Sequence, residues 1–194
     1  IRRDLRRLEA EGRIRRVHGA VLPVAVISPS FSEREGLHVA EKRRIAAEVV
    51  SRLRDGETVS IGGGTTAVEV ARALSPQRRL TIVTTAPAVA MVLAERPLIE
   101  TILVGGRLDA PTGTVTGARA VAAFADLRAD RALITACGID PGLGLTVSRH
   151  EEAFVLRAMI DAAASVLIAA TADKLATTSA HRIAPLGRCD GLIT

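Results

Sequence analysis

Residues 58–74 read TVSIGGGTTAVEVARAL, which predicts a short strand at Thr58–Ile61, three glycines and a helix at Thr65–Leu74. Glycines let a backbone curl closely around an anion, and the free N–H groups at a helix start bind it with help from the helix dipole. The motif is neither GxGxxG nor a P-loop, because no GK[ST] follows, so nucleotide binding is not indicated. A plain tight turn is the alternative, and we favour phosphate binding.

The alternation of strand and helix continues along the chain. The expected strands are 58–61, 80–84, 101–104, 132–136, 166–170 and 191–194, and the expected helices are 41–53, 65–74, 87–94, 118–127 and 151–164. Repeated strand–helix units of this length imply a parallel sheet with helices on both faces. Two of the strands, 132–136 and 166–170, are apolar enough to be buried in the centre of that sheet. The predicted fold class is therefore α/β with a mostly parallel sheet.

Three further polar or glycine-rich clusters follow predicted strands. They are Gly105-Gly106-Arg107, Gly138-Ile139-Asp140 and Asp173-Lys174. Each alone is more typical of a turn, but ligands of such sheets bind beyond the carboxyl ends of the strands, where all four clusters fall. Asp140, Glu151 and Lys174 are the set that an enzyme moving protons on a sugar would need. For Glu151 we favour the simpler interpretation of an acid in the first turn of a helix.

Composition excludes several classes of function. The chain has 194 residues, three Phe and no Trp or Tyr, so stacking of single-stranded nucleic acid on aromatic rings is not expected. Cys137 and Cys189 offer neither zinc spacing nor a disulfide framework. His18 and His38 lie outside the expected sheet, and His150 and His181 lack partners at metal-ligand spacing, so we expect no metal and no cofactor. No apolar run reaches the roughly 20 residues of a membrane span and no signal peptide is present, which favours a soluble, cytoplasmic protein.

The first 22 residues, IRRDLRRLEAEGRIRRVHGAVL, carry most of the net charge. Seven arginines and no lysine stand within the first eighteen residues against three acidic residues, so this end holds +4 of the total +5. Charge concentrated in this way favours a segment that binds a polyanion. Ile1, Leu5 and Leu8 share one helical face, and Gly12 stands where a helix stop belongs.

A small basic hairpin is expected after Gly12, because apolar and basic residues alternate over 14–21. A helix followed by a basic hairpin is typical of the end of a winged helix-turn-helix, whose recognition helix enters the major groove of DNA. The alternative is a solvated amphipathic helix whose charges only keep the chain soluble. Because Ile1 is already inside the expected helix, we expect residues to be missing before it.

Motifs along the chain follow the order of one bacterial family. Besides residues 1–22 they are FSEREGLHVAEKRRIA at 31–46, GGGTT at 62–66, VTT at 83–85, VGG at 104–106, TG at 116–117, CGID at 137–140, LRAMI at 156–160 and DK at 173–174. The whole chain thereby resembles a DeoR-type transcriptional regulator. The first stretch is similar to the family's recognition helix and wing, and the second to the segment that joins reader and sensor.

The resemblance implies a C-terminal domain with the fold of ribose-5-phosphate isomerase, which senses a phosphorylated sugar or related metabolite instead of transforming it. With Arg107 added from its position after a strand, the predicted effector-binding residues are Gly63, Gly64, Thr65, Thr66, Thr84, Thr85, Gly105, Gly106, Arg107, Gly138, Asp140 and Lys174. The predicted DNA-binding residues are Arg2, Arg3, Arg6 and Arg7 on the recognition helix and Arg13, Arg15 and Arg16 on the wing.

Four positions depart from the family pattern. Gly62 stands where the family usually has Asp, Thr85 where Asn is frequent, Leu156 where it has Lys, and Thr171 where it has Asp. Polar groups lost at the ends of strands should change which hydroxyl groups of a sugar are recognised. The chain also stops before the family's last strand, so we expect it to be trimmed at both ends.

We therefore expect a metabolite-responsive transcription factor of the repressor type. Its predicted parts are a partial winged helix-turn-helix at 1–22, a linker at 23–32 and an effector-sensing domain at 33–194. The predicted partners are DNA for the full-length protein, a phosphorylated sugar and further copies in a homo-oligomer. Effector binding would change how the two DNA-reading helices are spaced. The main alternative is a sugar-phosphate isomerase, and a weaker one is an oligomerisation domain with a decayed pocket.

Overall fold

A computed structural model describes residues 14–17, 20–23 and 29–194 of the chain. Strand β1 (Ile14–Val17) pairs antiparallel with β2 (Ala20–Pro23), which confirms the predicted hairpin. Arg15 and Arg16 of the predicted wing lie in β1. The predicted helix with Gly12 at its end, and the arginines Arg2, Arg3, Arg6, Arg7 and Arg13, lie outside the described residues.

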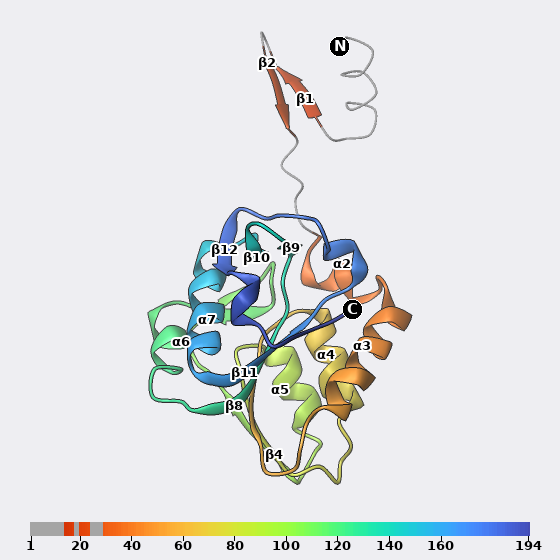
Figure 1. The fold of residues 1–194 in the computed structure, drawn as a ribbon, viewed down its shortest axis with the longest axis vertical. Helices are drawn as coiled ribbons and strands as arrows, with labels where there is room; N and C mark the ends of the chain where they lie inside the picture. The colour runs from red at the N-terminus through yellow and green to blue at the C-terminus, as the bar shows by residue number, and fades with distance from the viewer. Residues whose placement is uncertain (1–13, 18–19, 24–28) are drawn as a thin grey trace.

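A six-stranded parallel sheet forms the centre of the body (Figure 1). In spatial order its strands are β13 (Gly191–Ile193), β11 (Ala163–Ala169), β8 (Ala129–Ile134), β3 (Thr58–Ile61), β4 (Leu80–Thr84) and β5 (Ile99–Leu103). All five neighbouring pairs run parallel, with Ile61 opposite Thr84 on one side and Leu133 on the other. The predicted α/β class with a parallel sheet is therefore confirmed.

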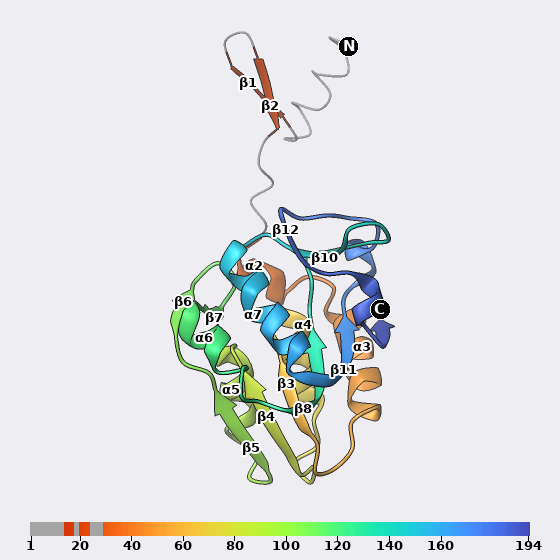
Figure 2. The ribbon, with the colours of Figure 1, turned by 60° about the vertical axis from the view of Figure 1, so that its left-hand side comes forward.

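Helices cover both faces of this sheet, as predicted (Figure 2). On one face lie α3 (Val39–Ser51), α4 (Thr65–Ala73) and α5 (Pro87–Leu93), and on the other α6 (Ala118–Ala122) and α7 (His150–Asp161). Alternate residues of a strand point to opposite faces. Leu133 of β8 accordingly packs in the core beneath α3 to α5, whereas its neighbours Ala132 and Ile134 pack in the core beneath α7.

The structure also has short antiparallel strands that were not predicted from the sequence. They are β6 (Arg107–Asp109) with β7 (Thr114–Thr116), and β9 (Gly138–Asp140) with β10 (Gly144–Val147) and β12 (His181–Ala184). With three or four residues each and much Gly and Thr, they lack the long apolar alternation that identifies a strand. The cluster Gly138-Ile139-Asp140, interpreted as a turn, is thus strand β9.

Some predicted boundaries were also wrong. The helix expected at 118–127 ends at Ala122, although the apolar run continues to Phe124, which is fully buried. The predicted linker 23–32 contains the end of β2 and the start of α2 (Phe31–Glu35). Ser30 caps α2, since its side chain accepts from the Glu33 N–H while Glu33 accepts from the Ser30 N–H. This capping box is a known helix start signal.

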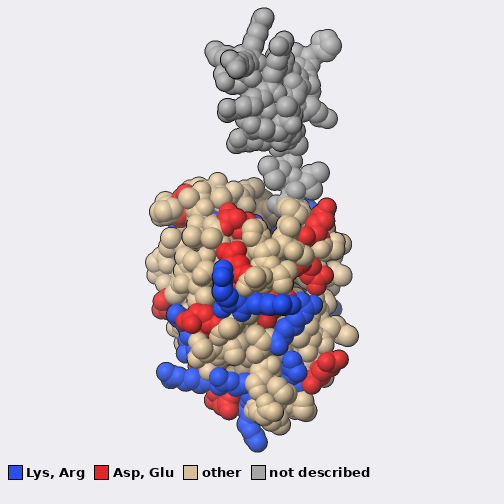
Figure 3. Space-filling model, turned by 90° about the vertical axis from the view of Figure 1, so that its right-hand side faces the viewer, with Lys and Arg blue, Asp and Glu red and all other residues tan. Residues whose placement is uncertain are grey.

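Within the described ranges, no helix is long and apolar enough to cross a membrane, and no three His, Cys, Asp or Glu side chains gather as metal ligands would. On the face seen in Figure 3, basic and acidic side chains are interspersed rather than segregated. This face of the body therefore differs from the arginine-rich first eighteen residues.

Candidate functional site

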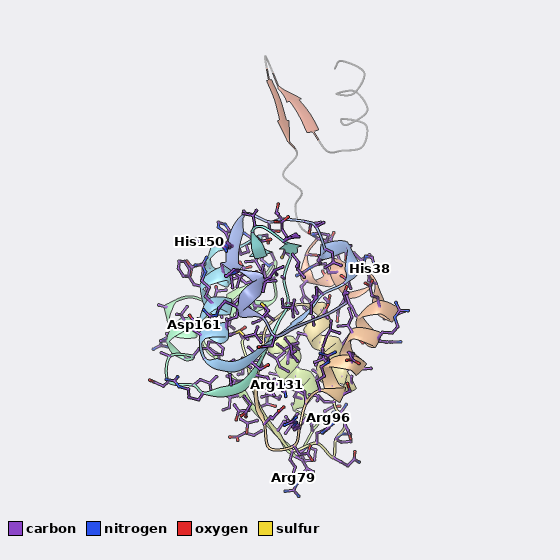
Figure 4. The ribbon with its side chains drawn as sticks, in the orientation of Figure 1. His38, Arg79, Arg96, Arg131, His150 and Asp161 are labelled. Atoms are coloured by element: carbon purple, nitrogen blue, oxygen red, sulfur yellow. The ribbon has the colours of Figure 1, made fainter. Side chains whose placement is uncertain are left out.

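A cavity of about 790 Å³ opens at the carboxyl ends of the central strands β3, β8 and β11. Its wall includes Gly64–Thr66 after β3, Thr135–Cys137 after β8 and Ala169–Thr171 at the end of β11. Ligands of open parallel sheets bind at this edge. His38, which lines the cavity, and His150 lie at this end of the body, and Arg79 and Arg96 lie at the opposite end (Figure 4). The volume suits a small metabolite.

The N-terminus of α4 forms one side of the cavity. Gly64 precedes the helix with φ 92°, a left-handed conformation that glycine adopts without strain. Thr65 and Thr66 open the helix, and the first N–H groups of a helix have no intrahelical acceptor. The Thr135 hydroxyl donates to the Gly63 carbonyl at 2.6 Å and so fixes the glycine loop to the next strand. Backbone donors and the helix dipole together suit an anion here.

Basic side chains from four different elements reach the same cavity. They are Arg34 of α2, Lys42 of α3, Arg149 at the N-cap of α7 and Lys174 of the short helix η1 (Ala172–Lys174). Lys42 is buried, and its ammonium donates to the Arg34 carbonyl at 2.6 Å. Burial, and then the Arg34 charge, hold the pKa of Lys42 below its ordinary value. A bound anion would offset both effects, since an opposite charge favours the ammonium form.

Two of the acidic side chains that line the cavity, Glu33 and Asp173, already accept hydrogen bonds within the protein. Glu33 closes the capping box of α2, and hydrogen bonds from Ser30 hold its pKa below the ordinary value. Asp173 accepts from Lys174 at 2.7 Å and from the Thr171 hydroxyl at 2.5 Å. Burial acts to raise the pKa of Asp173, but these hydrogen bonds outweigh it and the pKa is lowered.

Glu152 of α7 differs from both, and it is not among the site residues predicted from the sequence. Its Oε2 atom is buried and has no hydrogen-bond partner among the described residues. Burial raises the pKa of Glu152 to about 7, with Asp109 adding to the shift and Arg34 and Arg149 opposing it. A buried acceptor without a partner is unfavourable until a donor reaches it.

The spacing of buried residues along α7 could have identified Glu152 from the sequence. It lies four residues before Leu156 and seven before Met159, both buried, and so shares their inward face. The neighbouring Glu151, chosen for the isomerase alternative, is exposed. A carboxylate on the apolar stripe of an amphipathic helix was the available signal.

The predicted effector-binding residues divide into two groups. Gly64, Thr65, Thr66 and Lys174 line the cavity. The wall does not include Gly63, Thr84, Thr85, Gly105, Gly106, Arg107, Gly138 or Asp140. The Thr84 hydroxyl instead donates to the Ile61 carbonyl at 2.8 Å, and Arg107 lies in β6, which pairs with β7 in a separate sheet. A role for the second group in binding stays a prediction.

The three residues of the isomerase alternative are not brought together. Asp140 accepts from the N–H groups of Gly142 and Leu143 at 2.9 and 2.8 Å, which closes the turn between β9 and β10. Glu151 is exposed, and of the three only Lys174 lines the cavity. The geometry therefore offers no shared proton-transfer site for this set.

Two of the four departures from the family pattern touch each other. A Cβ atom added at Gly62 would lie 3.3 Å from Leu156 Cδ2 and 3.4 Å from the Leu133 carbonyl oxygen. Gly62 and Leu156 thus make a close apolar contact where the resemblance implied a pair of polar residues. Thr171, a third departure, lines the cavity, while Thr85 is buried and its carbonyl accepts from the Val115 N–H.

The sheet order, the helices on both faces and the cavity at the strand ends define an α/β fold that solved structures share. Ribose 5-phosphate isomerase A from Neisseria gonorrhoeae matches with a TM-score of 0.52 at 15% identity, over 71% of this chain and 53% of that chain. A tetrameric eIF2B-beta2-delta2 complex from C. thermophilum matches with a TM-score of 0.57 at 15% identity, over 84% of this chain and 57% of that chain. This chain thus spans little more than half of either, and the likeness shows the fold alone.

The family is shown by sequence. Residues 37–194 match the family model described as the DeoR C terminal sensor domain, and the chain therefore belongs to the DeoR family. The HTH-type transcriptional repressor CsqR of Escherichia coli K12 is 33% identical over all of this chain and 75% of its own length. The glycerol-3-phosphate regulon repressor of Escherichia coli K12 is 30% identical over all of this chain and 77% of its own length. These relatives are transcriptional regulators and not enzymes, which confirms the predicted family and speaks against the isomerase alternative.

Proposed function

We propose that this chain is the sensing part of a cytoplasmic, DNA-binding transcriptional repressor, and that its cavity binds a phosphorylated sugar or polyol. The observation that carries the proposal is the cavity at the ends of β3, β8 and β11, which combines a helix N-terminus, converging basic side chains and an unpartnered buried carboxyl. A phosphate fits the helix N-terminus and the cations, and a hydroxyl-bearing carbon chain fits the remaining space.

The phosphate is assigned to the N-terminus of α4. Thr65 and Thr66 supply backbone donors there, and Lys42 and Lys174 supply charge in the same cavity. Lys42 is the stronger candidate of the two cations, because Lys174 already pairs with Asp173 at 2.7 Å. Hydrogen bonds between charged groups of this kind are about twice as strong as neutral ones.

Helix α2 connects the cavity to the N-terminal segment along the chain. Its residues Glu33 and Arg34, with Pro29 and Ser30 before them, line the cavity and follow the arginine-rich segment in the chain. None of its five residues is buried. It is held by the Phe31 N–H, which donates to the Pro111 carbonyl at 3.1 Å, and by bonds to Lys42 and Arg72. A ligand that joins Arg34 to α4 would fix α2 more firmly.

Such a ligand would couple effector binding to DNA binding through α2. The proposed DNA contacts are Arg2, Arg3, Arg6, Arg7, Arg13, Arg15 and Arg16 in the full-length protein, which would act as a homo-oligomer on two half-sites. A useful response needs a coupling free energy of only about 1–3 kcal/mol. Fixing one short helix is an effect of that size.

Thermal unfolding tests the sensing proposal directly. Glycerol 3-phosphate, glucose 6-phosphate and fructose 6-phosphate are added to the chain, with glycerol, glucose and fructose as unphosphorylated controls. A ligand at about 100 times its Kd stabilises the folded state by about 2.7 kcal/mol, which raises the Tm of a domain of this size by roughly 5–10 °C. At least one phosphorylated compound should do so and its control should not. If none raises the Tm at millimolar concentration, the proposal is wrong.

A further inference from the structure

Glu152 stands at the wall of the cavity opposite α4. Leu156, one helical turn further along α7, touches the glycine loop at Gly62, so Glu152 is one turn of about 5.4 Å beyond that contact, toward the cavity. Because α4 and α7 cover opposite faces of the sheet, a ligand above the ends of β3 and β8 lies between them (Figure 2). One small molecule can therefore reach both helices.

The titratable groups near Glu152 come from several elements. The charged ones are Arg34 of α2, Arg149 before α7 and Asp109 at the end of β6, and the neutral Cys137 thiol follows β8. Arg149 Nε lies 3.9 Å from Asp109 Oδ2, and the opposite effects of these two charges on the pKa of Glu152 partly cancel. None of these groups donates a hydrogen bond to Oε2, which is buried. The carboxyl thus keeps a buried acceptor atom that no described residue uses.

We propose that Glu152 recognises a hydroxyl group of the ligand whose phosphate lies at the N-terminus of α4. The hydroxyl donates to the Glu152 carboxylate, whose Oε2 atom has no partner among the described residues, and the ligand spans the cavity from α4 to α7. The cavity then selects phosphorylated polyols and sugars over inorganic phosphate, which cannot fill the second position. This assignment rests on the proposed function and names the residue that recognises the hydroxyl groups of its effector.

A proton accompanies this recognition. The pKa of Glu152 is about 7, and only the ionised carboxyl offers both oxygens as acceptors. Binding of the hydroxyl donor therefore releases a proton from the fraction of molecules that carry one, and affinity rises with pH. Between about pH 6 and about pH 8 the gain from this group is roughly tenfold. Titration of the ligand's own phosphate adds to the pH dependence, but equally in wild type and variants.

Calorimetric titration of four proteins tests the assignment. The proteins are wild type, Glu152→Ala, Glu152→Gln and the matched control Glu151→Ala. Each is titrated with inorganic phosphate and with one polyol phosphate, the tightest binder among glycerol 3-phosphate, glucose 6-phosphate and fructose 6-phosphate. Glu151 adjoins Glu152 on the same helix but is exposed, so its variant should bind as wild type does. Glu152→Ala should lose at least about tenfold in affinity for the polyol phosphate, the effect of one hydrogen bond to a charged group. Its affinity for inorganic phosphate should stay equal or rise, because a negative charge has been removed.

The outcomes separate the two proposals. If no phosphorylated polyol binds wild type, the proposed function fails and this inference fails with it. If one binds and Glu152→Ala binds it equally well, the role of Glu152 is wrong while the proposed function stands. A parallel loss of inorganic phosphate affinity in Glu152→Ala also overturns the role. Glu152→Gln keeps the size of the side chain and should fold. Its affinity should lack the roughly tenfold rise between about pH 6 and about pH 8 that the Glu152 carboxyl gives the wild type.

Discussion

Replacing Glu152 by Gln should stabilise the chain in the absence of any ligand, and only at neutral to alkaline pH. In the folded state burial raises the pKa of this carboxyl from 4.5 to about 7. The folded state therefore binds the proton more tightly than the unfolded state does. As pH rises from about 4.5 through about 7, the folded state loses this advantage and stability falls, by about 1.4 kcal/mol for each pH unit, or about 3 kcal/mol in all. Gln resembles the protonated carboxyl and has no charge to bury.

Urea unfolding at about pH 5 and about pH 8 measures this difference. Far-ultraviolet circular dichroism is the suitable signal, because the chain has three Phe and no Trp or Tyr. Glu152→Gln should match wild type within about 1 kcal/mol at the lower pH and exceed it by about 3 kcal/mol at the higher pH, or roughly 6–12 °C in Tm. Glu151→Gln, on the exposed neighbour, should change little at either pH. A difference between Glu152→Gln and wild type that does not depend on pH would refute the reasoning.

Three further predictions concern other parts of the site and fold. Lys42→Met should weaken binding of glycerol 3-phosphate or glucose 6-phosphate at least about tenfold in calorimetry, because it removes a buried cation from the cavity wall. Unchanged affinity would remove Lys42 from the phosphate site. Gly144→Ala should lower the free energy of unfolding in urea by more than about 2 kcal/mol. Gly144 has φ 84°, and an added Cβ would lie 2.2 Å from the Ala184 carbonyl oxygen. Gly187→Ala is the control, because its added Cβ meets nothing within 4 Å. Purified chain should not convert ribose 5-phosphate, because Asp140 and Glu151 lie outside the cavity, and measurable turnover would restore the isomerase alternative.

The parts of the fold with strong local patterns could be predicted from the sequence. Apolar segments such as residues 132–136 and 166–170 predicted a buried parallel sheet, and the glycines at 62–64 predicted the loop between β3 and α4. The antiparallel strands β6, β7, β9, β10 and β12 could not be predicted, because each is fixed by its partner and not by its own three or four residues.

The site was predictable only where it follows the sheet. Gly64, Thr65 and Thr66 come directly after β3, so the edge of the sheet delivers them to the cavity. Asp140 was expected there as well, but the chain turns into β9 and uses its carboxylate to close the next turn. Arg34 lies in a segment interpreted as the start of the sensing domain, and nothing in its local sequence shows that α2 lines the cavity. Contacts between distant segments are decided by tertiary packing, which a local pattern does not report.

A crystal structure of the chain with the tightest-binding phosphorylated polyol tests the central claim most directly. We expect phosphate oxygens at roughly 2.7–3.2 Å from the backbone nitrogens of Thr65 and Thr66, and a ligand hydroxyl at hydrogen-bond distance from the Glu152 carboxylate. A ligand bound instead at Gly105-Gly106-Arg107, or a phosphate oriented toward α7 with the hydroxyl groups at α4, would contradict it.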